Sequence, residues 1–591
     1  MSLIPENEMQ FQLYDCLDTE VLLQRERFAE HSTQTFSAVL DTANKIASDL
    51  FLPHNALSDQ QEPTFDGKEV SMLDEVKVAY DAFCDAGFIA ARYDFVDDGM
   101  QLPETIMTGC SGYFMAANPA TTAYPFLTTA AANVISHFAS EELKAEFLPS
   151  MLSGKYSGTM ALTEPHAGSG LADITTSAVK SEAGHYLIKG SKLYISGGEH
   201  SLSENIIHLA LAKIPGGPKG VKGISLFVVP KFRGDSNASG AHTQKNDVVL
   251  AGLIHKLGYR GTTSTALTFG ENDDCHGYLV GEPHHGLQYM FMMMNEARVG
   301  VGFGAAMIGY RGYQYSLEYA KDRVQGGKPI VEHGDVKRML LLQKAYAEGA
   351  MSLCFYGARL VDDIKTHPDT SKQKSCEALL DLLTPVIKAW PSEYGPKAND
   401  LAIQVLGGAG YTREYPVEQL WRDNRLNPIH EGTNGIQALD LMGRKLWQNQ
   451  QTALAELQRR ISLDIRAANG TAGIECVAVL QPLLQQLPSL IEHIGNNLHS
   501  DERDNTLTNA HCFMEAFSTI IVAWIWLRQV NAAEQRLASS PGLSESQRHF
   551  YQGKCQAGMF FAQWELPKIQ ASIDLLIRND NSCHAMQTDW F

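Results

Sequence analysis

The chain has 591 residues, too many for one hydrophobic core, so we expect several domains. It carries 48 Lys and Arg against 67 Asp and Glu, a net charge of −19. This acidic balance argues against general binding to nucleic-acid backbones or anionic membranes, but it allows a local site for a phosphorylated ligand.

The cysteine pattern and the apolar stretches indicate the compartment. None of the ten cysteines forms a C-x-x-C pair, so we expect no metal site and no disulfide framework, but reduced and mostly buried thiols. The N-terminus is acidic and lacks a basic region followed by an apolar core, so we expect no secretion signal. Residues 520–527 are strongly apolar but far shorter than the roughly 20 residues of a membrane-spanning helix. We therefore expect a buried core helix there, no membrane span, and a cytoplasmic protein or one in an equivalent reducing compartment.

Helical periodicity comes first along the chain, and strand signals follow. Residues 21–154 show apolar positions at helical spacing, for example Val76, Ala79 and Phe83. From residue 156, short β-prone runs alternate with Gly and Ser. The predicted strands are 158–162, 186–188, 193–195, 206–214, 224–229 and 264–269. The segment 233–246 is predicted as an exposed excursion.

Long helices are predicted for the rest of the chain. Four helical stretches precede residue 448, and further helices follow to the end. The four stretches are 286–324, 333–365, 374–405 and 435–447. The predicted fold class is therefore α+β and multidomain. The predicted domains are a helical N-terminal domain at 1–155, a central β-domain at 156–280, a helical bundle at 281–447 and an additional helical domain at 448–591.

Two motifs follow predicted strands in the β-domain. Thr163-Glu164-Pro165-His166-Ala167-Gly168-Ser169 comes directly after the first strand, and Leu193-Tyr194-Ile195-Ser196-Gly197-Gly198 comes thirty residues later. Small residues and hydroxyls at a strand end bring backbone N–H groups and side-chain oxygens close to a planar or phosphorylated ligand. Either motif alone is equally typical of a tight turn.

A second cluster of motifs lies between residues 404 and 437. It contains QVLGGAGY, then EYPVEQLWRD, then HEGTNGIQ, which places Glu431 between His430 and Gly432. Pro428 stops regular structure, and Thr433 is suited to cap the helix that follows. Glu431 is therefore predicted to lie in a turn just before a helix.

Taken together and in this order, these motifs resemble the acyl-CoA dehydrogenase family over roughly residues 40–447. TEPHAGS and LYISGG look like the family's two flavin-contacting motifs, and HEGTNGIQ looks like its C-terminal signature, with Glu431 at the catalytic base. The extension beyond residue 447, together with ISLFVVPKF and MNEARVGVG, resembles the long subfamily that includes 3-methylmercaptopropionyl-CoA dehydrogenase and some mycobacterial fatty acyl-CoA dehydrogenases.

The resemblance implies a helical N-terminal domain, a central β-barrel-like domain and a C-terminal four-helix bundle, with FAD as the cofactor bound partly across a dimer interface. Its implied partners are an acyl-CoA substrate, an electron-transfer flavoprotein as acceptor, and a second copy of the chain in a homodimer or dimer of dimers. The implied FAD contacts are Thr163, Ser169, Ser196, Arg323, Gln325, Gln404, Gly408 and Thr433. The implied substrate contacts are Asn295, Arg298 and Gly432.

The chemistry explains the need for a carboxylate. Dehydrogenation removes a proton from Cα and a hydride from Cβ of a thioester, and only a cofactor can take the hydride. A carboxylate in a site that excludes water becomes a stronger base, because desolvation raises its pKa. In this family the thioester oxygen is held by the backbone N–H of the base and by a ribityl hydroxyl of FAD, and the adjacent Gly432 leaves room for that approach.

One rival base and two departures from the family pattern stand in the sequence. Some members place their base immediately before the arginine of MNEAR, but that residue is Ala297 here. Glu296 is one position earlier, which turns a helical side chain by about 100°, so Glu431 is favoured. His430 stands where the family often carries Tyr, and Gly170 replaces a common acidic residue.

Three other functions stay open at this point. An acyl-CoA oxidase would pass electrons to oxygen, and sequence separates it poorly from a dehydrogenase. A DNA-associated flavoprotein of the same fold would need a basic C-terminal face, but residues 447–591 carry 14 acidic and 10 basic residues. A catalytically silent scaffold is opposed by the intact Glu431.

Overall fold

The structure is a computed structural model that describes residues 2–234 and 242–591. The side chains of residues 242 and 291–296 also lie outside the described part. The chain forms two compact units. Unit 1 comprises Met1–Ser37, Pro103–Gly112 and Arg298–Phe591, and unit 2 comprises Ala38–Leu102 and Tyr113–Ala297. The N-terminal segment thus belongs with the C-terminal half, and the four sequential domains stay a prediction.

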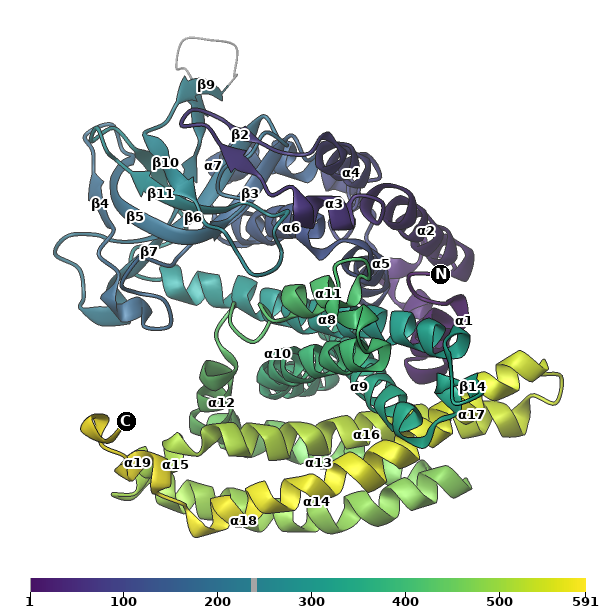
Figure 1. Ribbon diagram of the computed structural model, residues 1–591. Coiled ribbons are helices and arrows are strands. Elements are labelled where there is room, and N and C mark those ends of the chain that lie inside the picture. Colours follow the sequence, from purple (N-terminus) through teal and green to yellow (C-terminus); the bar gives the residue numbers. More distant parts are fainter. Residues whose placement is uncertain (1, 235–241) are drawn as a thin grey trace. The chain divides into compact units, whose positions relative to one another are not determined.

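Unit 2 is built around an eight-stranded sheet (Figure 1). Its strands are β3 (Tyr156–Ala161), β4 (Ser177–Lys180), β5 (Tyr186–Ser196), β6 (Asn205–Lys213), β7 (Ile224–Pro230), β10 (Val248–Leu253), β11 (Ser264–Phe269) and β12 (His276–Leu279). The strand order is β10-β11-β5-β12-β7-β6-β3, and β4 pairs with both β5 and β6. The pairings β5-β12-β7-β6-β4 return to β5, so the sheet closes on itself as the predicted barrel-like domain.

The predicted strands are confirmed, with three additions. Every residue of β7 is buried, and β6 is buried up to its last residue, as expected of near-continuous apolar runs. The predicted strands 186–188 and 193–195 are one long strand, β5. Sequence periodicity missed β4, β10 and β12. Within the predicted excursion, β8 (Phe232–Gly234) pairs with β9 (His242–Lys245), and residues 235–241 lie outside the described residues.

Helices and a short hairpin complete unit 2. They are α2 (Thr33–Ile46), α3 (Asn55–Gln60), α4 (Asp74–Asp85), α5 (Glu104–Ala117), α6 (Pro119–Phe138), α7 (Glu141–Leu152), β1 (Thr64–Phe65) and β2 (Val70–Ser71). The first residues of α2 and α5 are assigned to unit 1. α6 packs on β3. Gly158 makes this approach possible, because a Cβ there would lie 2.5 Å from Cβ of Ala131.

Long helices form the part of unit 1 that carries the base motif. They are α8 (Gly286–Asp322), which belongs to unit 1 from Arg298 onward, α9 (Gly334–Thr366), α10 (Thr370–Leu406), α11 (Val417–Asn424) and α12 (Asn434–Gly443), with the hairpin β13 (Val324–Gln325) and β14 (Lys328–Pro329). The four predicted helical stretches are confirmed. α8 and α10 run in close contact, since a Cβ on Gly302 would lie 2.0 Å from the carbonyl oxygen of Ile387. This packing explains Gly302 of the helical GVGFG run, whereas Gly300 has open space on its side-chain face.

The additional C-terminal helices pack around one apolar helix (Figure 1). They are α13 (Thr452–Ala467), α14 (Thr471–Leu498), α15 (Arg503–Thr508), α16 (Ala510–Ser539), α17 (Glu545–Phe560), α18 (Gln570–Arg578) and α19 (Ser582–Ala585). α16 contacts α12, α14, α17 and α18. Residues 520–527 are all at most 5% exposed, which confirms the predicted core helix. By length and composition α14 and α16 both pass as membrane spans, but 83% of the apolar window of α16 is buried within the protein.

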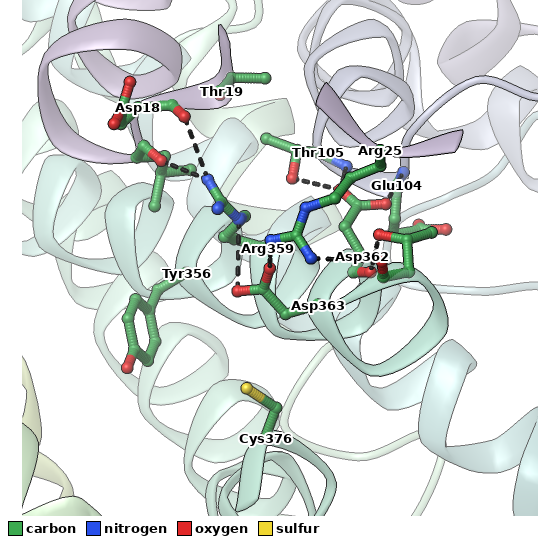
Figure 2. Close-up of polar contacts among 12 residues, drawn as sticks. Asp18, Thr19, Arg25, Glu104, Thr105, Tyr356, Arg359, Asp362, Asp363 and Cys376 are labelled. Carbon is green, nitrogen blue, oxygen red and sulfur yellow. Dashed lines mark hydrogen bonds and ion pairs between the residues drawn. The ribbon is translucent and has the colours of Figure 1, made fainter. Parts of the chain in front are cut away.

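The N-terminal segment, which begins with α1 (Glu6–Gln10), is held to unit 1 by polar contacts. Arg25 pairs with Asp363 at 3.2 Å, and Arg359 donates to the carbonyl oxygen of Leu17 at 2.5 Å (Figure 2). The neighbouring Asp362 accepts the backbone N–H groups at the start of α5, at 2.7 and 2.9 Å. Burial raises the pKa of Asp362 to about 6, although these hydrogen bonds act in the opposite direction.

A buried ionic cluster fastens the same segment to the C-terminal helices. The Lys554 ammonium on α17 donates to Glu8 at 2.7 Å and to Glu348 of α9 at 2.8 Å. Lys344 also pairs with Glu348, and Gln12 donates to Glu8 at 2.9 Å. Lys554, Glu8 and Glu348 are each at most 1% exposed, so every charge depends on its partners for the hydration that it has lost.

Candidate functional site

Glu431 lies in a tight turn between α11 and α12. Its φ is +54°, a left-handed conformation that costs energy for any residue other than glycine, and Gly432 follows at +81°. The side-chain amide of Gln437 donates to the carbonyl oxygens of Glu431 at 3.2 Å and of Gly432 at 3.4 Å. The Asn434 N–H donates to the carbonyl oxygen of Pro428 at 3.0 Å and closes the loop. The turn is therefore held by its own helix.

Thr433 is the N-cap of α12. Its hydroxyl accepts the N–H of Ile436 at 3.3 Å, which confirms the predicted cap. The predicted position of Glu431, in a turn just before a helix, is also confirmed. Since the turn and the cap are set locally, the HEGTN sequence itself defines how the base candidate enters the helix.

Two cations oppose the effect of burial on Glu431. Burial of this half-buried carboxyl raises its pKa, whereas Arg298 and then Lys388 lower it. Burial outweighs the cations, so the pKa stays above its ordinary value. A carboxylate with a raised pKa is a better proton acceptor, provided that the pH is high enough to keep it ionised.

Lys388 on α10 is a group that the sequence analysis did not select. Its side chain is fully buried, and its ammonium donates to the Asn434 side-chain oxygen at 3.0 Å. Burial lowers its pKa to about 7, although Glu431 raises it. The one signal in the sequence was a lysine inside the apolar stretch 382–391.

His430 is neutral at physiological pH. Burial, with a smaller contribution from Lys388, lowers the pKa of its imidazole to about 3. Within the described residues, its Nε2 atom and the side-chain oxygen of Gln437 are buried and have no hydrogen-bond partner. Two unpaired polar atoms next to Glu431 are suited to contact a ligand, because such groups are costly when left unpaired.

Arg298 lies beside the Glu431 turn. It is 3% exposed, and its guanidinium lies 3.5 Å from Asp440 of α12. Asp440 also binds Arg444 at 2.7 Å. The structure thus brings Arg298 close to the Glu431 turn, and its role as a substrate contact stays a prediction. Asn295 and the rival carboxylate Glu296 lie outside the residues whose side chains are described.

In unit 2, the two predicted flavin motifs are adjacent. The Leu193 N–H donates to the carbonyl oxygen of Thr163 at 2.9 Å. Glu164 and Lys192, both at most 2% exposed, form a buried ion pair at 3.0 Å. Burial alone would raise the pKa of Glu164, but Lys192 and the Thr176 hydroxyl lower it to about 2. Glu164 is therefore a structural anchor between the motifs.

Replacing Lys192 by Met is expected to destabilise unit 2 by about 3 kcal/mol, because Glu164 stays buried without its counterion. Urea unfolding measures this loss, and flavin release at lower urea should accompany it. Lys189→Met is the matched control on the same strand, because Lys189 and its partner Asp273 are both exposed. Equal effects of the two variants would contradict the anchoring role.

Three predicted flavin-contacting hydroxyls line the end of these strands. Ser169 and Ser196 are exposed and Thr163 is half-buried. Within the described residues, none of these hydroxyls has a hydrogen-bond partner. Gly168 is open on its side-chain face, since a Cβ there would meet only the Thr163 methyl group, at 4.0 Å. This edge presents polar groups that are available to a cofactor.

The other predicted cofactor residues surround one apolar cluster of unit 1. This cluster includes Ala320 and Ile330, next to the β13–β14 hairpin, and Val405 and Leu406 at the end of α10. Arg323, Gln325, Gln404 and Gly408 are all exposed at its border. Gly407, between the last two, has a φ of +61° and open space on its side-chain face. The apolar residues that flank these four residues in sequence therefore belong to one cluster, and the role of the four residues stays a prediction.

The comparisons with known proteins cover most of the chain. The family model "Acyl-CoA dehydrogenase, C-terminal domain" matches residues 284–446, and "Acyl-CoA dehydrogenase, middle domain" matches 159–271. The model "Acetyl-CoA dehydrogenase C-terminal like" matches residues 454–587.

Relatives and solved structures extend the similarity to full length. The 3-methylmercaptopropionyl-CoA dehydrogenase of Ruegeria pomeroyi is 32% identical and covers 92% of each chain. The broad-specificity linear acyl-CoA dehydrogenase FadE5 of Mycobacterium tuberculosis is 31% identical over 97% of this chain and 96% of its own. Caenorhabditis elegans ACDH-11 in complex with C11-CoA has a TM-score of 0.76 at 17% identity, covering 97% of this chain and 95% of its own. An acyl-CoA dehydrogenase complexed with FAD from Bacillus anthracis has a TM-score of 0.74 at 19% identity, covering 97% of this chain and 93% of its own. Both solved structures have the same fold as this chain.

Proposed function

Because the chain belongs to the acyl-CoA dehydrogenase family, we propose that it oxidises an acyl-CoA thioester to the 2-enoyl-CoA, with Glu431 as the base and FAD as the cofactor. The observation that carries this proposal is the Glu431 turn: a carboxyl of raised pKa, held in a left-handed conformation beside two cations. A turn that costs energy and carries a perturbed carboxyl is typical of a catalytic group.

Glu431 removes the proton from Cα of the thioester. Its raised pKa brings the carboxyl closer to the acidity of the group that it must deprotonate, which strengthens it as a base. The chemistry that bound FAD would supply is acceptance of the hydride from Cβ. Arg298 and Lys388 supply the positive charge that keeps the carboxylate ionised before the reaction.

The backbone N–H of Glu431 holds the thioester oxygen, where negative charge develops as the proton leaves. Within the described residues this N–H has no acceptor, so it is available to a substrate. Gly432 suits this position because its φ is +81° and a Cβ there would lie 2.8 Å from the side-chain nitrogen of Gln437. A donor at this position stabilises the transition state more than the ground state.

We propose the cofactor contacts that the family implies. Thr163, Ser169 and Ser196 present unpaired hydroxyls that fit the polar parts of FAD, and Thr433 caps α12 next to Glu431. Arg323, Gln325, Gln404 and Gly408 are exposed, as groups that reach the FAD of a second subunit would be. Asn295 and Arg298 complete the proposed acyl-CoA site. We propose a homodimer or a dimer of dimers on this basis.

The proposed physiological setting follows from the same family. An electron-transfer flavoprotein is the proposed electron acceptor, in a cytoplasmic β-oxidation reaction. The ten free cysteines, six of them buried, fit a reducing compartment. Nucleic acid is not among the proposed partners, given the acidic C-terminal region.

Anaerobic bleaching of the flavin tests the proposed function. The purified protein is expected to be yellow and to lose its colour when the correct acyl-CoA is added, because the hydride reduces the flavin. The panel contains short, medium, long, aromatic and sulfur-containing acyl-CoAs, and Glu431→Gln is the control that should stay coloured. Persistent colour of the unmodified protein across the whole panel would contradict the proposal. Hydrogen peroxide released on turnover without an added acceptor would identify an oxidase instead.

A further inference from the structure

Lys388 places a buried ammonium next to the segment that carries Glu431. Its acceptor, Asn434, is the first residue of α12 and stands three positions after Glu431. The amide nitrogen of Asn434 in turn lies 3.4 Å from the carbonyl oxygen of Ala389 and 3.4 Å from Glu393. Asn434 thus joins α10 to the start of α12, and it fixes the ammonium relative to the turn.

The ammonium has no close carboxylate partner. Within the described residues, Lys388 forms no salt bridge, although it is fully buried. The charged groups that act on it are Glu431, which attracts it, and Arg298, which repels it. His430 lies close enough to sense Lys388 but is itself neutral. A buried ammonium without a paired anion is costly, so its electrostatic effect on Glu431 is the benefit that accounts for it.

Resting on the role proposed for Glu431, we propose that Lys388 is a positioning residue that keeps the Glu431 carboxylate ionised and, through Asn434, fixes the turn before α12. Arg298 also faces Glu431, but Asp440 lies 3.5 Å from its guanidinium and offsets part of its charge. Arg298 lowers the pKa of Glu431 more than Lys388 does, but Lys388 forms no salt bridge within the described residues, so no neighbouring carboxylate offsets its charge while the ammonium is protonated. It does not touch the substrate; it acts through the base.

The pH dependence follows from the two groups together. As pH falls through the raised pKa of Glu431, the base is protonated and activity is lost. As pH rises through about 7, Lys388 loses its proton and no longer stabilises the Glu431 carboxylate electrostatically. The two groups attract each other when both are charged, so they titrate as a coupled pair.

Four variants test this role by two independent readouts. Lys388→Met removes charge and hydrogen bond, Lys388→Gln keeps a donor for Asn434 without the charge, and Lys388→Arg keeps the charge. Lys374→Met is the matched control, an exposed lysine on the same helix. The first readout is the acid limb of the kcat/KM profile. The second is the Glu431 carboxyl band in infrared difference spectra of the holoenzyme, identified by its absence in Glu431→Gln.

Removal of the Lys388 charge in Lys388→Met and Lys388→Gln is expected to raise the midpoint of the Glu431 titration by about one pH unit in both readouts. Lys388→Arg should restore it and Lys374→Met should leave it unchanged. An unchanged infrared midpoint in the neutral variants overturns the proposal. If Lys388→Met and Lys388→Gln both fail to fold, the unmodified enzyme provides the test. Its Glu431 carboxylate band should change a second time near pH 7, where Lys388 loses its proton. A single transition across the pH range overturns the proposal. The two proposals can fail separately. If Glu431→Gln stays active but the neutral Lys388 variants still shift the infrared titration of Glu431, the catalytic role of Glu431 fails and its electrostatic coupling to Lys388 stands.

Discussion

Glu431→Gln is expected to bind FAD normally and to lose turnover by about 10²–10⁴-fold, the contribution of one positioned general base. Gln has nearly the same shape as Glu but cannot accept the α-proton at neutral pH. The turn should survive, because the Gln437 amide and the Thr433 cap hold it through backbone groups. Stopped-flow flavin reduction under anaerobic conditions measures the chemical step directly, and the flavin spectrum measures cofactor content.

Glu296→Gln is the control for this experiment. Glu296 is the carboxylate that the sequence offers as a rival base, and its substitution is expected to change flavin reduction less than tenfold, since a residue outside the proton transfer loses none of the base's contribution. Near-normal reduction in Glu431→Gln together with a large loss in Glu296→Gln would move the base to α8. A loss of FAD in Glu431→Gln would instead show that the side chain supports the fold of the site.

Lys554→Met is expected to cause the largest loss of stability, about 3–5 kcal/mol of the free energy of unfolding. In the part of the chain that the structure describes, it leaves the buried Glu8 with the Gln12 amide as its one hydrogen-bond partner, while Glu348 keeps Lys344. The N-terminal segment should then detach first. Urea unfolding measures the loss, and limited tryptic cleavage at Arg25 or Arg27 reports the detachment.

Lys568→Met provides the comparison for this effect. Lys568 also pairs with a glutamate, Glu565 at 2.6 Å, but its side chain is 63% exposed. Water solvates the Lys568 ammonium, and the buried Glu565 carboxylate keeps the Tyr346 hydroxyl as a donor at 2.7 Å, so this variant should lose only about 1 kcal/mol. If Lys554→Met were no more destabilising than Lys568→Met, the buried cluster would not be the fastening of the N-terminal segment.

The position of Glu431 was predictable because the signal is local. A proline that ends regular structure, a glycine after the base and a capping threonine all lie between positions 428 and 433, and they form the observed turn. The helices were predictable for a similar reason, since burial on one face leaves a periodic pattern in the sequence. Strands β4, β10 and β12 were missed because short, partly exposed strands leave little alternation.

The sequence by itself determined which chemical groups this protein carries, their order, and the local turns that present them. Only the tertiary structure decided which distant groups share a site. Lys388 meets Asn434 across 46 residues, and Lys554 meets Glu8 across 546. Such pairs cannot be recognised from the local spacing of residues. The packing of the helices brings them together, and no repeat in the sequence encodes it. For the same reason, the pKa values of Glu431 and His430 depend on burial that only the fold creates.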